Sequence, residues 1–188
     1  MEPSNQRGDT LIEVLLAMVV LSIVIVGSSL IINVGLRNAI NAVEHTQVRN
    51  VIAGQGETLR YLRDTAQIKK SGPIFETWQD IQASYANNNP SGDVESCVPA
   101  AGKQAFYLET TFTSSSQPPS ITPRAYSTGN TPETFATPGR GMWIEAVRPS
   151  GLNPSSPPYI DFYIRACWGG LGTDIAQQSN SVVRLYVQ

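Results

Sequence analysis

The chain has 188 residues, of which 15% are charged, and its formal net charge at pH 7 is −2. This length allows one domain plus an appendage, and a weakly negative chain without a basic patch has no field that attracts nucleic acid. The single histidine, His45, excludes a histidine-based catalytic triad and a metal site with several histidines. We therefore predict that the chain is not an enzyme, holds no metal or other cofactor and binds no nucleic acid.

A polar segment of eight residues precedes a long apolar one at the N-terminus. After Glu13 the chain is apolar and uncharged for about twenty residues, which is long enough to cross a bilayer. No small-residue cleavage site follows cleanly after Gly27, so the run is expected to stay attached as an anchor and not to be removed as a secretory signal. The carboxylate at its start is unexpected, since a lone carboxylate inside hydrocarbon costs about 2.5–3.5 kcal/mol on insertion scales.

Beyond the apolar run, the apolar residues thin to a single helical stripe. Such a stripe favours an amphipathic helix that lies against another part of the chain. Its members are Leu36, Ile40, Val43, Val48, Val51, Ile52, Leu59, Leu62 and Ala66. Two lysines, then Gly72 as a candidate cap and Pro73, predict the end of the helix. We predict one helix from about residue 10 to about residue 70, with residues 9–35 as its transmembrane half and residues 36–71 as its amphipathic half.

Residues 72–188 are predicted to form a globular head. A short helix is expected first, with Phe75, Trp78, Ile81 and Tyr85 on one face. Four strands follow, at residues 105–112, 142–147, 159–168 and 181–188, and the segments between them, such as SSSQPPSITP, have the composition of loops. The fold class is therefore α+β, with a long N-terminal α-helix packed on a C-terminal antiparallel β-sheet.

The third predicted strand alternates between two kinds of side chain. Apolar residues share one face, and Tyr159, Asp161, Tyr163 and Arg165 share the other, which predicts a sheet buried on one side only. We accordingly expect Asp161 and Glu145 to be solvated residues and not a catalytic carboxylate pair, and we expect His45 to be a solvated residue on a helix face.

The two cysteines, Cys97 and Cys167, both follow the apolar run. If this part of the chain faces an oxidising compartment, they are expected to form one disulfide that closes a loop of about 70 residues. Two buried thiols are the alternative.

The stretch RGDTLIEVLLAMVVLSIV, residues 7–24, resembles the N-terminus of type IV pilins and pseudopilins. It has a class III-type leader that ends in glycine, a Thr-Leu-Ile-Glu-Val core and an uninterrupted apolar run. The resemblance covers about the first 35 residues, and beyond them only the architecture is similar, with a long helix followed by a strand-rich head, often with a C-terminal disulfide.

This resemblance implies a role for three residues at the N-terminus. Residues 1–8 correspond to the leader, which a prepilin peptidase removes by cutting between Gly8 and Asp9, and the same enzyme methylates the new amine of Asp9. Glu13 corresponds to the fifth mature residue. The protonated amine of one subunit then pairs with Glu13 of its neighbour and sets the axial stagger of the filament.

The resemblance also implies partners and a location. The expected partners are the prepilin peptidase/methyltransferase, other pilin subunits in a homo- or hetero-polymer, and the assembly platform with its ATPase. Membrane lipid surrounds the helix before assembly. The precursor is expected in the cytoplasmic membrane as a single-pass protein with its head outside, and the mature subunit in a cell-surface pilus. Adhesion, motility and DNA uptake stay open as the task of that pilus.

Asp9 departs from the family pattern, in which the first mature residue is commonly phenylalanine or another apolar residue. Its carboxylate can compensate the adjacent amine, which favours a minor pilin. Two alternatives stay open, a pseudopilin of a type II-like secretion or DNA-uptake system and a membrane-anchored adhesin or binding module that does not polymerise.

Overall fold

The computed structural model describes residues 9–87, 99, 104–112, 118–126, 141–149, 158–169 and 176–187. Contacts within the chain divide it into two compact units, Met1–Val43 and Glu44–Gln188, which we call the N-terminal unit and the head unit. The elements in chain order are α1 (Asp9–Ile68), α2 (Pro73–Asp80), a π-helical turn η1 (Ile81–Tyr85), β1 (Ala86–Asn87), β2 (Phe106–Thr111), β3 (Ser120–Ala125), β4 (Gly141–Val147), β5 (Tyr159–Gly169) and β6 (Ala176–Tyr186).

The first helix confirms the predicted long span, but its end differs in detail. α1 is a continuous helix of 60 residues, and the backbone N–H of Lys69 still donates to the carbonyl of Thr65 at 2.8 Å. Gly72 does not cap α1. It has a positive φ of 98° and is the N-cap residue of α2. Pro73 then starts α2, because the first turn of a helix does not need the N–H that proline lacks.

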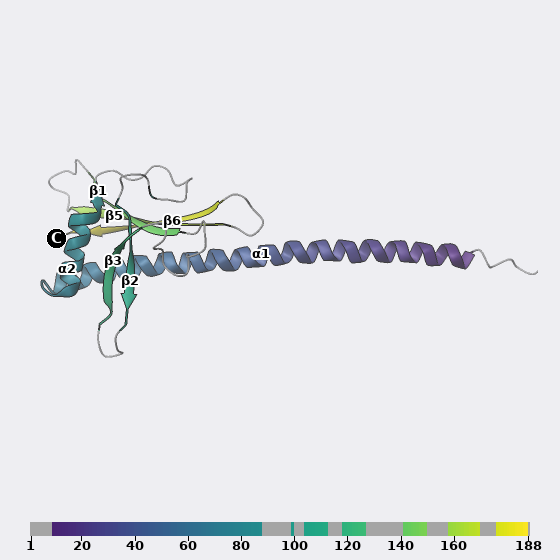
Figure 1. The fold of residues 1–188 in the computed structure, drawn as a ribbon, viewed down its shortest axis with the longest axis horizontal. Helices are drawn as coiled ribbons and strands as arrows, with labels where there is room; N and C mark the ends of the chain where they lie inside the picture. The colour runs from purple at the N-terminus through teal and green to yellow at the C-terminus, as the bar shows by residue number, and fades with distance from the viewer. Residues whose placement is uncertain are drawn as a thin grey trace, which may run out of the picture. The chain divides into compact units, whose positions relative to one another are not determined.

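The strands form one sheet in the order β3-β2-β4-β5-β6, and neighbours along this path are antiparallel. Figure 1 shows β2 beside its partner β3 in the head unit. The short β1 lies off this path and pairs in parallel with β4. The four predicted strands correspond to β2, β4, β5 and β6. β3 was predicted as a loop because prolines occur within and before it, and that prediction is wrong.

The side chain of Gln55 in α1 explains how β3 accommodates a proline. Gln55 Nε2 donates to the carbonyl of Leu108 at 3.0 Å, and Gln55 Oε1 accepts from the N–H of Leu108 at 2.9 Å. Both backbone groups of Leu108 thus point away from β3, so Pro123, which lies opposite Leu108, occupies a position without ladder hydrogen bonds. Its missing N–H therefore leaves no bond to β2 unmade.

The core of the head unit lies between the second half of α1 and one face of the sheet. The stripe predicted from the sequence is buried from Val48 onwards, where it packs against apolar side chains of β4, β5 and β6. These buried residues are Val48, Ile52, Leu59, Leu62 and Ala66 from α1 and Met142, Ile144, Ala146, Ile160, Phe162, Ile164, Ala166, Val183 and Leu185 from the strands.

Gly56 brings α1 close to the sheet. A Cβ at this buried position would lie 3.3 Å from Val183 Cγ2 and 3.6 Å from Ile164 Cδ1. Glycine in a helix interior is less favourable than alanine by about 1 kcal/mol, so close packing against β5 and β6 is the reason this glycine is useful here.

The opposite face of the sheet corrects the prediction of one-sided burial. Glu145 and Asp161 were expected to be solvated, but they are 2% and 7% exposed, and Arg165 is 6% exposed. Burial is tolerated because these charges have partners. Trp143 Nε1 donates to Glu145 at 3.0 Å, Arg165 lies 3.8 Å from Glu145, and Arg184 donates twice to Asp161 at 2.7 and 2.8 Å. The alternation of apolar and polar residues correctly predicts which residues share each face of the sheet, but it does not show whether the polar face is buried.

His45 was also expected to be solvated, and it is instead partly buried. Its ring packs edge-on against Trp168 in β5, with 5.7 Å between ring centroids. The only histidine of the chain therefore serves as a packing residue at the start of the head unit.

Candidate membrane and assembly helix

Between Leu11 and Leu36, the surface of α1 is predominantly apolar on every side and uncovered. Each large apolar side chain between Leu11 and Leu36 is 52% to 74% exposed, whereas Leu59 and Leu62 in the head unit are fully buried. By length and composition, the helix is able to cross a membrane. A continuous apolar surface of this kind is unstable in water, so lipid or the helices of other molecules must cover it.

Three serines within this apolar surface are satisfied by the helix itself. Three serine hydroxyls donate to the backbone carbonyl four residues earlier, at 2.7 to 2.9 Å: Ser22 to Met18, Ser28 to Val24 and Ser29 to Ile25. The helix runs unbroken through Gly27 and the two serines that follow it. The serine hydroxyls were the sequence signal for this unbroken helix, because a hydroxyl that donates to a carbonyl of its own helix costs little inside lipid.

Glu13 is the one ionisable residue between Asp9 and Arg37. Its side chain is exposed, in the second turn of α1, and no ion pair or hydrogen bond joins it to another residue that the structure describes. Asp9 is the first residue of α1. Gly8, the residue predicted to precede the cleavage site, lies outside the described residues. One molecule thus presents an available carboxylate in an apolar surface, and only the environment of the helix can supply its partner.

Only part of the apolar stripe predicted for the amphipathic half is covered. Leu36, Ile40 and Val43 belong to the N-terminal unit and are 58%, 36% and 57% exposed. They continue one face of the helix at spacings of four and three residues. Apolar surface available for other molecules therefore extends beyond the segment that composition alone assigns to the membrane.

Cys167 lies in a small buried cluster on the face of the sheet opposite α1. It is fully buried beside Trp143 and Ala105, and Tyr126 packs against this cluster. Gly141 pairs with Cys167 across the two strands, and a Cβ at Gly141 would lie only 2.7 Å from the Tyr126 hydroxyl. Burial raises the pKa of Tyr126 above its usual value. Cys97, the predicted disulfide partner, lies outside the described residues, so the pairing stays a prediction.

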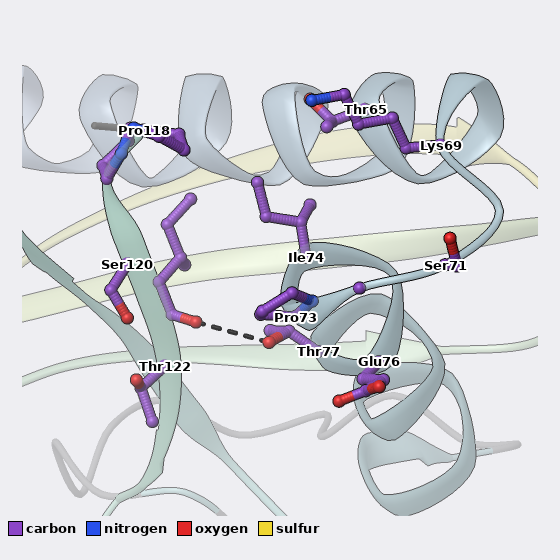
Figure 2. A pocket seen from close by; sticks show the side chains of 13 residues that line it. Thr65, Lys69, Ser71, Pro73, Ile74, Glu76, Thr77, Pro118, Ser120 and Thr122 are labelled. Carbon is purple, nitrogen blue, oxygen red and sulfur yellow. Dashed lines mark hydrogen bonds between the residues drawn. The ribbon is translucent and has the colours of Figure 1, made fainter. Parts of the chain in front are cut away.

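A groove of about 470 Å³ lies between the end of α1, the start of α2 and β3 (Figure 2). Thr77 from α2 crosses it and donates to the carbonyl of Ile121 in β3 at 3.4 Å. Its walls carry prolines and hydroxyl groups, and Lys69 and Glu76 are the charged residues that line it. Among the described residues, no three His, Cys, Asp or Glu side chains come together to hold a metal ion. The groove therefore offers no chemistry that would assign a reaction to it.

Comparison with known proteins identifies the N-terminal segment. Residues 3–29 match a family model described as the prokaryotic N-terminal methylation motif. This match covers most of the polar leader, Gly8, Asp9, Glu13 and most of the apolar run, so the motif is the class III leader of type IV pilins. Neither the curated proteins nor the solved structures give a significant match.

Proposed function

We propose that this chain, whose N-terminal methylation motif supports a type IV pilin-like or pseudopilin precursor, is a structural subunit of a type IV pilus-like filament. It is made as a membrane-anchored prepilin, cleaved after Gly8, methylated at the amine of Asp9 and polymerised through its N-terminal helix. The subunit acts by assembling into the filament and itself catalyses no reaction.

The observation that carries the proposal is the uncovered apolar surface of α1 between residues 11 and 36, which bears a single carboxylate. Lipid covers this surface before assembly, and neighbouring helices cover it in the filament. Exchanging lipid for apolar side chains changes the hydrophobic free energy little, so close packing and polar contacts decide which helices associate and in which register.

Glu13 supplies the strongest register-setting contact in this scheme. Cleavage creates an α-amine that is mostly protonated at neutral pH, and methylation keeps its positive charge. In an apolar bundle, each isolated charge is costly, and the pair forms when the amine of one subunit meets Glu13 of its neighbour. Because the amine and the carboxylate lie one helical turn apart along α1, pairing between molecules fixes their axial offset.

The exposed part of the helical stripe supports the same assignment. Within the head unit, the stripe is buried against the sheet from Val48 onwards, whereas Leu36, Ile40 and Val43 of the N-terminal unit are exposed like the apolar run. Contacts between neighbouring helices in a filament are thus able to continue past the membrane segment, while the heads form the outer surface.

The test is the mass of the chain's N-terminus after expression with a prepilin peptidase. We expect the mature chain to begin at Asp9 and to carry a methyl group on its amine. Gly8→Leu should keep the leader attached and abolish incorporation into fibres, whereas Gly35→Ala, a change in the same helix with open space around it, should leave cleavage unchanged. Surface fibres built from chains that still carry residues 1–8 would overturn the proposal.

The same measurement separates the alternatives. An intact leader on a chain that stays in the membrane favours the non-polymerising adhesin or binding module. A processed chain in short fibres that depend on a secretion ATPase favours the pseudopilin. A minor pilin, which Asp9 favours, is expected at low stoichiometry in fibres made mainly of another subunit, and Asp9→Phe should raise that stoichiometry.

A further inference from the structure

The two edges of the sheet, β3 and β6, differ in how their outward backbone groups are covered. At the β3 edge, the carbonyl of Ile121 accepts a hydrogen bond from Thr77 of α2, and Pro123 has no N–H to offer. Proline and a covering helix are both devices by which sheets prevent further strands from pairing. The β3 edge is therefore closed.

At the β6 edge, one hydrogen bond shows which residues face outward. The N–H of Val187 donates to the carbonyl of Pro158 at 2.8 Å, toward β5. Residues of an antiparallel strand direct their backbone groups alternately to the two sides, so the even-numbered residues of β6 direct their N–H and C=O groups outward. Among them Asn180, Val182, Arg184 and Tyr186 have exposed side chains, with Val182 53% exposed.

Within the part of the chain that the structure describes, β6 has neither a covering element nor a proline on its outer edge. The strand is 11 residues long, contains neither proline nor lysine, and no described strand pairs with its outer edge. Its one charged residue, Arg184, is held by two hydrogen bonds to Asp161 in its own sheet, so its charge is already compensated. Long unprotected edges of this kind are templates for another strand.

We propose that the outer edge of β6 pairs with β6 of a second copy of this chain, antiparallel and around a two-fold axis at Val182. The strand is self-complementary in this register. Val182 faces its own copy, an exposed aliphatic side chain against another, and Arg184 faces the uncharged amide of Asn180. No like charges lie directly opposite each other, and a contact of this kind buries the same patch on both molecules.

The orientation of this contact distinguishes it from assembly through α1. A two-fold axis at a strand edge reverses the strands, so the two heads point in opposite directions. Subunits stacked through α1 repeat without such a reversal, so β6 pairing is a contact distinct from that assembly. This interaction goes beyond the proposed function and does not depend on Glu13.

Charge substitutions at the two-fold axis test the proposal on the full mature chain in detergent micelles. Val182→Lys and Val182→Glu each place two like charges opposite each other and should each abolish the concentration-dependent dimer of the unmodified chain in sedimentation experiments. Mixing the two variants should restore a heterodimer. A dimer that survives in either variant alone, or a mixture that stays monomeric, would overturn the proposal.

Cross-linking checks the register independently. Val182→Cys brings two thiols within disulfide distance across the axis and should give a covalent dimer on non-reducing gels. Asn180→Cys adds a thiol at another exposed position of the same edge, which faces Arg184, and should give about tenfold less covalent dimer. Equal cross-linking at both positions would exclude this register. Loss of filaments in Glu13→Ala with β6 pairing intact would count against the proposed function alone.

Discussion

Glu13 is the residue on which assembly is expected to depend, because it is the one carboxylate in an otherwise apolar surface. Replacing it with alanine removes one partner of the proposed pair and leaves the amine of a neighbouring subunit uncompensated in the bundle. Breaking such a buried pair costs about 3 kcal/mol or more. We expect Glu13→Ala to lower incorporation into fibres roughly a hundredfold, measured by quantifying the subunit in sheared fibres and in membranes.

Ser22→Ala is the matched control for this experiment. Ser22 is an exposed polar residue in the same apolar surface, but its hydroxyl is already bonded to Met18 of its own helix. Its removal should leave incorporation within about twofold of the unmodified level, since no intermolecular partner is lost. Equal effects of the two substitutions would show that any polar-to-alanine change in α1 perturbs assembly.

Two glycines only two residues apart in α1 are expected to respond in opposite ways. Gly54 has open space around its Cα, so Gly54→Ala should stabilise the head by about 0.5–1 kcal/mol through helix propensity. A side chain at Gly56 would meet Val183 and Ile164, so Gly56→Leu should destabilise the head by about 1–3 kcal/mol through overpacking. Thermal unfolding followed by near-ultraviolet circular dichroism checks both, and a destabilised Gly54→Ala would contradict the packing described here.

At the scale of elements, α1 and β2 are joined by the pair of hydrogen bonds between Gln55 and Leu108. Gln55→Leu keeps the approximate side-chain volume but leaves the N–H and C=O of Leu108 without partners. We expect this change to lower the free energy of unfolding by about 1–3 kcal/mol, measured by chemical denaturation of the full chain in detergent.

Arg60→Ala is the control for that prediction. Arg60 lies on the same helix and forms an exposed ion pair with Glu57, and such pairs contribute about 0–1 kcal/mol. If Gln55→Leu were no more destabilising than Arg60→Ala, the clamp between helix and strand would have no energetic role.

At the scale of the whole molecule, a disulfide between Cys97 and Cys167 is the predicted covalent link within the head. It would close a loop of about 70 residues and stabilise the head by about 2–4 kcal/mol through restriction of the unfolded chain. We expect digestion without reductant to release a peptide pair joined through these cysteines, and we expect Cys97→Ser to lower the unfolding temperature. Two thiols that react with an alkylating reagent after unfolding without reductant would contradict the prediction.

Particular residues show how far the sequence alone is informative about the fold. The long apolar run, the stripe from Val48 onwards and the alternation in β5 are local patterns, and each correctly predicted its element. Pro123 led to the wrong prediction of a loop in place of β3, because its place in a strand depends on Gln55, which lies far away in the sequence. Glu145 and Asp161 were wrongly predicted to be solvated, because the burial of a polar face depends on the partners that the fold brings to it.

The motif that defines the candidate site is recognisable from the sequence, since Gly8, Asp9 and Glu13 lie within one short segment that matches the N-terminal methylation motif. The pairing of the cysteines and the roles of these three residues remain predictions.

The sequence by itself determined the membrane-length helix, its methylation motif and the α+β class, because periodicity, composition and a contiguous motif depend on neighbouring residues only. Only the tertiary structure decided which part of the helical stripe is covered and that β3 joins the sheet. It also decided that charged side chains pair on the face of the sheet opposite α1 and that no described strand pairs with the outer edge of β6. These features depend on contacts between residues distant in the chain, and local pattern carries no information about which distant partners meet.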